Sequence, residues 1–243
     1  MKILGIIPAR FASTRFPGKP LAQIRGKSMI QRVYEQAAKS TLLADVIVAT
    51  DDGSIAEEVT RFGGKFVMTA STHISGTDRC AEVINKLSGF DSVVNIQGDE
   101  PFIDPSQIDL LASCFDDHNV QIATLIKRVD NQEDLFNENI PKVILNDLDE
   151  AIYFSRQTIP FLRNVLKTDW LEKGTFFKHI GIYGYTVTAL QHITKLKPSS
   201  LELAESLEQL RWIEAGYKVK TRKTAIETIA IDTPEDLIKI NGL

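Results

Sequence analysis

The sequence predicts an α/β fold with a mainly parallel central sheet and helices on both faces. In the N-terminal half, short apolar or β-branched runs alternate with segments whose apolar residues repeat at helical spacing. Repeated strand–helix units of this kind favour a doubly wound parallel sheet. The chain has 243 residues, of which 43% are hydrophobic and 25% charged, so it can form one substantial core.

The elements of the first half follow in order from local signals. An apolar run predicts the first strand, and after a long loop apolar residues at helical spacing predict a helix from Met29 to Ala38. Residues 45–50 are rich in β-branched side chains and predict a strand, and the helix after them ends at Gly63-Gly64. At Asp104 an N-cap, a proline and Gln107 together predict another helix start. The expected strands are 3–7, 45–50, 65–68, 92–96 and 121–126, with a further helix at 78–87.

The alternation loosens near residue 128. Residues 129–175 mix short apolar runs with Asn, Asp and Pro, so we expect a small β-rich insertion lobe at about 129–200 within one domain that spans 1–243. A single helix is expected at 201–214, with Leu203, Leu207 and Leu210 on one face. Strands are expected at 176–185, 218–221 and 225–231, and a last helix opening at 233–236.

Bulk features exclude several classes of protein. No apolar run approaches the roughly 18 residues of a membrane-spanning helix, and the N-terminus has no long apolar region of a secretory signal. Cys80 and Cys114 are too few for a disulfide framework or a thiolate metal site. We therefore expect two buried thiols and a cytoplasmic protein.

The net charge of −4 hides a steep asymmetry. Residues 1–40 hold eight basic side chains and one acid, a charge of +7, whereas residues 41–243 hold 20 basic and 31 acidic side chains, a charge of −11. A split of this size needs an explanation.

A basic loop follows the first expected strand. It runs from Pro8 to Pro20 and contains Arg10, Arg15 and Lys19 among small residues. Because ligands of open α/β sheets bind at the carboxyl ends of strands, this loop is a candidate anion site. A solvated basic loop is the alternative.

Two other nucleotide motifs are rejected. Gly26-Lys27-Ser28 looks like the end of a Walker A loop, but Leu21 stands where that motif needs its first glycine. No G-x-G-x-x-G follows a strand either, which disfavours a dinucleotide-dependent dehydrogenase.

Two acidic segments also follow expected strands. Asp99 and Glu100 come after the strand at 92–96, and Asp232 comes after the one expected at 225–231. One or two carboxylates suit Mg²⁺ when water and substrate phosphate complete the octahedron. Each segment taken alone also fits a structural role, for example as a helix cap. Together with the basic loop, they indicate phosphoryl or nucleotidyl transfer.

In these and several other segments, the chain resembles the acid-sugar cytidylyltransferases, and among them those that act on 3-deoxy-manno-octulosonate (KDO). The resemblance spans nearly the whole chain, and the segments that carry it are 8–20, Ala49-Thr50-Asp51, 75–79, Gln97-Gly98-Asp99-Glu100-Pro101, Tyr153-Phe154-Ser155-Arg156, 179–185, 207–211 and Asp232-Thr233-Pro234-Glu235-Asp236. Two departures stand out: Ser28 replaces a common Pro, and Ile229-Ala230 replaces a usual Thr-Gly before Asp232.

The resemblance implies a Rossmann-like nucleotidyltransferase fold and the reaction CTP + KDO → CMP-KDO + pyrophosphate. It also implies Mg²⁺ as cofactor and a cytoplasmic homodimer that serves lipopolysaccharide biosynthesis, with dimer contacts from the insertion lobe. Neither a nucleic acid nor a membrane is expected as a partner, since the remainder of the chain is acidic.

The resemblance also assigns residues. The catalytic set it implies is Arg10, Arg15, Lys19, Asp99 and Asp232, of which Asp99 and Asp232 bind the metal. The implied CTP site is Pro8, Ala9, Arg10, Arg15, Lys19, Ser75, Gly76, Arg79 and Gln97. The implied sugar site is Gln97, Arg156, His179, Tyr183, Glu208 and Gln209.

Alternatives remain open for both residues and function. By themselves His179, Arg156 and the pair Glu208-Gln209 are typical of a structural histidine, a surface cation and mid-helix polar positions. His179 is otherwise a reserve general base. The acid sugar could be 8-amino KDO or an N-acylneuraminate, and a non-catalytic nucleotide-binding or nucleic-acid-binding module is the rival of another class.

Overall fold

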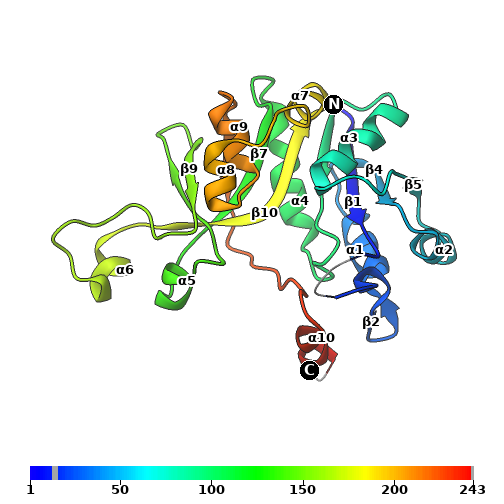
Figure 1. Cartoon of the computed structure of the whole chain (residues 1–243), viewed down its shortest axis with the longest axis horizontal. Coiled ribbons are helices and arrows are strands. Elements are labelled where there is room, and N and C mark those ends of the chain that lie inside the picture. The colour runs from blue at the N-terminus through cyan, green and yellow to red at the C-terminus, as the bar shows by residue number, and fades with distance from the viewer. Residues whose placement is uncertain (13–15, 242–243) are drawn as a thin grey trace. The chain divides into compact units, whose positions relative to one another are not determined.

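The structure, a computed structural model, describes residues 1–12 and 16–241. These residues form two compact units (Figure 1). The first unit comprises Met1–Ser113, Gly184–Thr194 and Thr228–Leu243, and the second comprises Cys114–Tyr183 and Lys195–Glu227. The second unit thus contains most of the expected 129–200 insertion together with flanking segments.

The first unit is built on a parallel sheet in the order β6-β1-β4-β5. The strands are β1 (Ile3–Ala9), β4 (Leu43–Thr50), β5 (Phe66–Met68) and β6 (Ser92–Asn95). Between them lie α1 (Met29–Ala37), α2 (Gly53–Arg61) and α3 (Gly76–Lys86), followed by α4 (Pro105–Ala112) and later by α7 (Val187–Ile193) and α10 (Pro234–Asn241). Helices α1 and α3 both pack on β1 and β4. Because β1 and β6 pair in parallel, their carboxyl ends lie side by side.

The second unit contains both parallel and antiparallel strand pairs. Strand β7 (Ile122–Arg128) pairs in parallel with β11 (Val219–Lys223), and β8 (Lys142–Leu145) pairs antiparallel with β9 (Ala151–Ser155) and β10 (Phe177–Thr186). Its helices are α5 (Gln132–Phe136), α6 (Trp170–Lys173), α8 (Ser200–Glu205) and α9 (Gln209–Glu214), with 3₁₀ turns η2 (Ser113–Asp116) and η3 (Lys167–Asp169). The α/β prediction with a mainly parallel sheet is confirmed.

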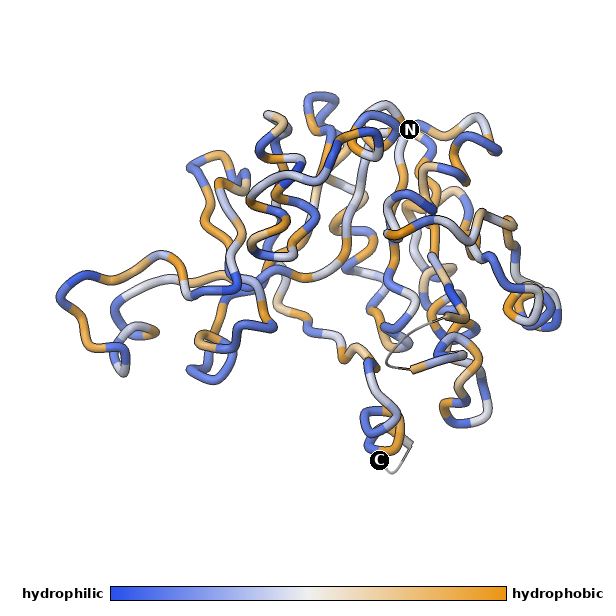
Figure 2. Tube along the Cα trace, viewed as in Figure 1, coloured by the Kyte–Doolittle hydropathy of each residue, from blue (hydrophilic) through white to orange (hydrophobic). Residues whose placement is uncertain are grey.

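Sequence patterning explains where the helices lie. Hydrophobic and hydrophilic residues alternate along them (Figure 2), as expected for helices that bury one face. Asp104 accepts from the Ser106 N–H at 2.9 Å as the predicted cap of α4. Ser28 accepts from the Gln31 N–H as the cap of α1.

The rejected Walker-like segment is a hairpin. Strands β2 (Gln23–Ile24) and β3 (Lys27–Ser28) pair across Arg25 and Gly26, whose φ angles are 47° and 80°. Positive φ at both central residues is the geometry of a tight two-residue hairpin. The Lys27 ammonium pairs with Glu35, at 2.6 Å from Oε2.

Three expected elements are corrected by the structure. The helix predicted at 201–214 is divided into α8 and α9 because Ser206 adopts a left-handed conformation with φ 52°. Leu203 is consequently 70% exposed, whereas Leu210 is fully buried. The strand predicted at 225–231 is absent, because these residues form no ladder. Helix α3 begins at Gly76 instead of Asp78, because Ser75 caps it.

Cys80 and Cys114 are buried and form no disulfide, as predicted. Among the described residues, no helix has the length and apolar character needed to cross a bilayer.

A small apolar cluster secures the C-terminal helix. Buried Ile231 and Ile240 pack with Ile24 of the hairpin and Met29 of α1, and Leu237 covers them. The cluster holds the start of α10 close to the hairpin, and this contact determines where the preceding residues lie.

Candidate active site

A cavity of about 190 Å³ lies at the carboxyl ends of β1 and β6 in the first unit. It is lined by Pro8, Ala9, Arg10, Lys19, Pro20, Ser75, Gly76, Arg79, Gln97, Gly98 and Asp99. Every residue of the predicted CTP site is therefore in its wall except Arg15, which lies outside the described residues. This is the edge of a parallel sheet at which ligands are expected.

Close contact between two strand ends shapes the floor of the cavity. A Cβ atom at Gly98 would lie 2.8 Å from the carbonyl oxygen of Pro8, which is closer than real Cβ atoms approach. Glycine at this position lets the segment after β6 pass directly over the end of β1.

The basic loop returns to the sheet through a glycine turn. The Gly18 N–H donates to the carbonyl of Phe11 at 2.9 Å, and Gly18 has a positive φ of 69°. Lys19, the first residue of the 3₁₀ turn η1 (Lys19–Leu21), is thereby directed into the cavity, while Arg10 stays exposed at its edge.

The ammonium group of Lys19 bridges two carboxylates. Its Nζ lies 2.8 Å from Oδ2 of Asp99 and 3.1 Å from Oδ1 of Asp232. The Lys19 side chain is 12% exposed, against 29% for Asp99 and 44% for Asp232. Two acidic side chains far apart in the sequence thus converge on one cation.

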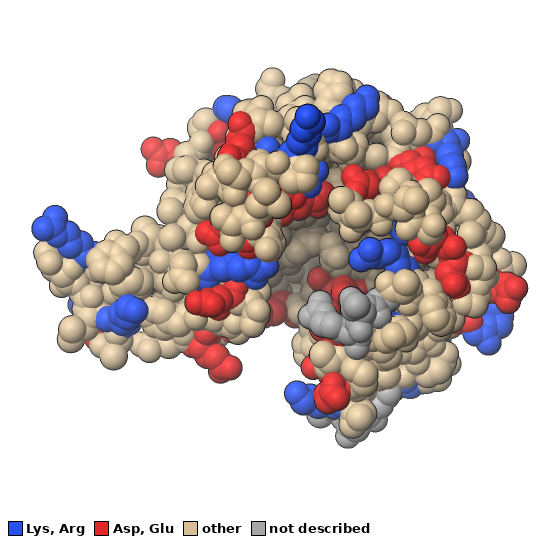
Figure 3. Space-filling model, in the orientation of Figure 1, with Lys and Arg blue, Asp and Glu red and all other residues tan. Residues whose placement is uncertain are grey.

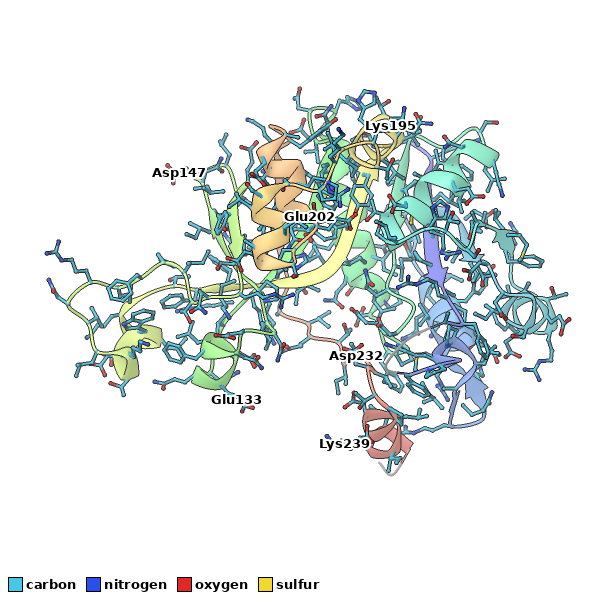
Figure 4. All side chains as sticks on the ribbon, viewed as in Figure 1. Glu133, Asp147, Lys195, Glu202, Asp232 and Lys239 are labelled. Carbon is cyan, nitrogen blue, oxygen red and sulfur yellow. The ribbon has the colours of Figure 1, made fainter. Side chains whose placement is uncertain are left out.

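Asp232 lies in the segment that leads into α10 (Figure 4). The hydroxyl of Thr233 accepts from the Asp236 N–H, and Asp236 Oδ2 accepts from the N–H groups of Asp232 at 3.1 Å and Thr233 at 3.0 Å. Hydrogen bonds from Thr233 and from the Asp232 backbone lower the pKa of Asp236. This reciprocal cap fixes the backbone from which Asp232 projects.

A buried arginine supports the opposite wall. Arg79 of α3 donates from Nη2 to Asp51 Oδ2 at 3.1 Å and from Nη1 to the hydroxyl of Thr69. That hydroxyl in turn donates to the carbonyl of Thr50 at 3.1 Å. A buried charge is tolerated when it is paired and hydrogen-bonded, so Arg79 links α3 to the end of β4.

Glu100, the residue after Asp99, is buried and bonded to a neutral partner. The hydroxyl of Thr228 donates to Glu100 Oε2 at 2.6 Å, and the Ile231 N–H donates to the Asp99 carbonyl at 2.9 Å. Burial raises the pKa of Glu100.

The predicted sugar-binding residues, apart from Gln97, lie in the second unit. His179 and Tyr183 are in ring contact with centroids 5.0 Å apart, and Tyr183 meets Trp212 edge-on at 5.0 Å. The negative charge of Glu208 acts on Tyr183, although burial is the larger cause of that residue's raised pKa. Gln209 is buried at the start of α9. Glu208 and Gln209 therefore begin a helix and are not mid-helix positions.

His179 has the environment of a structural histidine. Burial lowers its pKa to about 3, and its Nε2 lies 3.0 Å from the hydroxyl of Thr124. Because that hydroxyl donates to the Ile182 carbonyl at 2.7 Å, Nε2 carries the hydrogen and donates to Thr124. An imidazole with such a low pKa is a weak base at neutral pH, which argues against its use as a reserve base.

Arg156 lines a different cavity, of about 410 Å³, that also involves Trp170. Its guanidinium donates to three backbone carbonyls, those of Glu138, Glu205 and Ser206, at 3.1, 2.7 and 3.3 Å. The structure thus brings His179, Tyr183 and Glu208 together, whereas Arg156 connects the 138 loop to the end of α8.

The surface carries charges of both signs. On the face shown in Figure 3, Lys and Arg side chains lie among Asp and Glu side chains and form no continuous basic field. The first-unit cavity combines cationic and acidic walls in the same way.

Comparisons with known proteins identify the family. A family model described as cytidylyltransferase matches residues 4–229. The 3-deoxy-manno-octulosonate cytidylyltransferase of Cytophaga hutchinsonii is 59% identical over 242 residues, which cover 99% of this chain and 96% of that protein. The protein of the same name from Bacteroides thetaiotaomicron is 59% identical over 241 residues, covering 98% and 96%.

The chain belongs to the 3-deoxy-manno-octulosonate cytidylyltransferase family. The chain is similar over its full length to a solved structure described as CMP:2-keto-3-deoxy-manno-octonic acid synthetase complexed with CTP. The match has a TM-score of 0.92 and 43% identity, covering 100% of this chain and 98% of that one. The sequence-based resemblance to this cytidylyltransferase family is confirmed, and with it the prediction of an enzyme.

Some residues that shape this cytidylyltransferase site were not predicted from the sequence. The motif at 97–101 contains Gly98 but does not by itself predict the close contact with Pro8. No local pattern marks Thr228, whose partner Glu100 is 128 residues away.

A substitution at Gly98 tests the close contact in the cavity floor. We expect Gly98→Ala to lower the free energy of unfolding by about 1–3 kcal/mol, because the added Cβ would overlap the Pro8 carbonyl. Urea denaturation of the purified protein measures this difference.

Gly53→Ala is the matched control. No atom lies within 4 Å of a Cβ built at Gly53, the first residue of α2. We expect this change to stay within about 0.5 kcal/mol of wild type. Equal effects of the two substitutions would contradict the proposed contact.

Proposed function

We propose that the protein transfers the cytidylyl group of CTP to KDO, giving CMP-KDO and pyrophosphate. The observation that carries this proposal is the first-unit cavity at the ends of two parallel strands, in which Lys19 pairs with the carboxylate of Asp99 and Arg10 lies at the edge. The names of the relatives and the CTP complex of the similar structure support the same reaction.

The cationic residues would receive the triphosphate. Arg10 is exposed at the edge of the cavity and Lys19 reaches its interior, so both can donate to phosphate oxygens. Arg15 belongs to the same proposal on sequence grounds alone. Arg79 has a different part, because its guanidinium is engaged with Asp51 and Thr69 and thus shapes the wall.

Pro8, Ala9, Ser75, Gly76 and Gln97 would border the nucleotide. They come from the end of β1, the start of α3 and the segment after β6, and all of them line the cavity.

Asp99 and Asp232 are proposed as ligands of Mg²⁺. No cluster of three or more His, Cys, Asp or Glu suitable for a metal is found in the described part of the chain. A pair of carboxylates fits the requirement nonetheless, because Mg²⁺ takes one or two from the protein and the rest from water and substrate phosphate. Both carboxylates pair with the same Lys19 ammonium, which indicates that they can share a cation. Bound there, Mg²⁺ would supply neutralisation of phosphate charge and would lower the pKa of a coordinated hydroxyl.

In the proposed reaction the anomeric hydroxyl oxygen of KDO bonds to the α-phosphorus of CTP. The bond from the α-phosphorus to the bridging oxygen breaks, pyrophosphate leaves and the hydroxyl proton passes to water. The chain's residues act by positioning two anionic substrates and offsetting their repulsion. In this process the Lys19 ammonium would exchange its carboxylate partners for phosphate oxygens. No residue is needed as a general base, which agrees with the low pKa of His179.

The sugar would be recognised by Gln97, Arg156, His179, Tyr183, Glu208 and Gln209. This assignment rests on the family. The donors of Arg156 that remain beyond its three carbonyl partners would be those available to a carboxylate. KDO is preferred over 8-amino KDO and N-acylneuraminate because of the names of the relatives.

A cytoplasmic homodimer serving lipopolysaccharide biosynthesis is the proposed context. Exposed apolar side chains in the second unit, such as Phe161 at 70%, Leu166 at 73% and Ile152 at 52%, support burial against a second copy.

One assay tests the proposed reaction. The protein is incubated with Mg²⁺, CTP and one acid sugar at a time, and pyrophosphate is measured. We expect release that depends on KDO. Release only with 8-amino KDO or an N-acylneuraminate would select a different substrate, and no release with any sugar would favour a non-catalytic nucleotide-binding module.

The metal assignment is tested at Asp99. In Asp99→Asn we expect CTP binding to persist while turnover falls roughly 100-fold or more, because one ligand of the proposed cation is lost. Calorimetry with CTP and the pyrophosphate assay give the two values. Glu235→Gln, which removes an exposed carboxylate three residues from Asp232, should leave both unchanged. Near-normal turnover in Asp99→Asn would refute the assignment.

The bridging role of Lys19 gives a separate prediction. In Lys19→Met without nucleotide, Mn²⁺ should bind at least about tenfold more tightly than in wild type. The reason is that the Lys19 ammonium no longer competes with the metal for the carboxylates of Asp99 and Asp232. Electron paramagnetic resonance of free Mn²⁺ measures this affinity. Lys27→Met is the control, since Lys27 pairs with Glu35. Unchanged Mn²⁺ affinity in Lys19→Met would contradict a shared cation site.

A further inference from the structure

The segment from Thr228 to Asp232 is tied to the segment that carries Asp99 by two hydrogen bonds. The hydroxyl of Thr228 donates to Glu100 Oε2 at 2.6 Å, and the Ile231 N–H donates to the Asp99 carbonyl at 2.9 Å. The first bond fixes the beginning of the segment and the second fixes the residue just before Asp232. Asp99, which lines the cavity, and Asp232, which pairs with the same lysine, are thus linked through the segments that carry them.

The middle of this segment is exposed among the residues that the structure describes. Ile229 is 59% exposed, and Ala230 is exposed as well. Ile231 is fully buried in the apolar cluster beneath α10. Side-chain packing therefore anchors one end of the segment. The Thr228 hydroxyl anchors the other, directly after Glu227, whose carboxylate pairs with Lys127 at 2.8 Å and with Lys178.

Glu100 is a buried carboxylic acid that is hydrogen-bonded to an uncharged side chain. The residue is 9% exposed, and its hydrogen-bonding partner is the neutral hydroxyl of Thr228 instead of a cation. Burying a carboxyl group in this way costs free energy that an apolar side chain would not. Glu100 does not line the cavity, and its carboxyl group bonds to Thr228.

We propose that the Thr228–Glu100 hydrogen bond is a brace that positions Asp232 against Asp99. Glu100 and Thr228 are then positioning residues, which act through the two carboxylates without contacting substrate. The inference rests on the proposed function in that Asp99 and Asp232 are taken as the metal ligands.

The brace predicts a selective effect on metal affinity. Thr228→Val keeps the shape of the side chain and removes the donor. With CTP present and no sugar, we expect Mn²⁺ to bind about 10–100-fold more weakly, the scale on which groups behind metal ligands act. CTP affinity without metal should stay within about twofold, because Thr228 does not line the cavity.

Two conservative variants should rescue metal binding. Thr228→Ser keeps a hydroxyl, and Glu100→Gln keeps an oxygen that accepts from Thr228. We expect both to bind Mn²⁺ within a few-fold of wild type. Thr224→Val is the matched control, because the Thr224 hydroxyl accepts from the Ile226 N–H and has no partner role at Asp99 or Glu100.

Electron paramagnetic resonance of Mn²⁺, calorimetry with CTP and thermal melting are measured on every variant of the full chain. If Thr228→Val folds poorly, Thr228→Ala tests the same bond with a smaller side chain. The proposal is overturned if the Thr228 variants lose melting temperature but keep wild-type Mn²⁺ affinity, since the bond would then only stabilise the fold. It is also overturned if Thr228→Ser loses as much affinity as Thr228→Val.

The outcome is separable from that of the proposed function. Mn²⁺ affinity is measured without turnover, so it reports on the brace whichever acid sugar is the substrate. Failure of wild type to release pyrophosphate with any sugar would refute the reaction, whereas weakened Mn²⁺ binding in Thr228→Val would still support the brace.

Discussion

The site depends on one interaction, the ion pairs of Lys19 with Asp99 and Asp232. The three residues come from the basic loop, the segment after β6 and the entrance to α10, with separations of 80 and 213 residues from Lys19. Two carboxylates close enough to share an ammonium would repel each other without a cation. The Lys19 ammonium offsets this repulsion because it pairs with both carboxylates.

The surrounding structure can be understood as support for this convergence. Gly98 allows the segment after β6 to cross the end of β1, and the left-handed Gly18 turns the loop back so that Lys19 enters the cavity. The apolar cluster around Ile231 and the Thr233–Asp236 cap hold the other side. These ion pairs also connect the two parts of the asymmetric charge distribution. Lys19 belongs to the basic N-terminal segment, and Asp99 and Asp232 belong to the acidic remainder of the chain.

Local signals predicted the elements where they agreed with the fold. Asp104 caps α4 as expected, and the β-branched run at 45–50 lies within β4. They failed where the chain takes an unusual conformation: the left-handed Ser206 interrupts the helical pattern of Leu203, Leu207 and Leu210. They failed also at 225–231, whose apolar residues resemble a strand but have no ladder partner. In both cases the outcome depends on contacts outside the local window.

The sequence by itself determined the fold class, the family and most of the residues that line the first-unit cavity, because motifs and hydrophobic periodicity are local properties of the chain. Only the tertiary structure decided that Lys19 sits between Asp99 and Asp232, that Arg79 is engaged with Asp51, and that Thr228 bonds to Glu100. These pairings join residues that are far apart in sequence, and their geometry follows from how the strands and the last helix pack. A pattern along the chain reports which groups are available, whereas packing determines which of them meet.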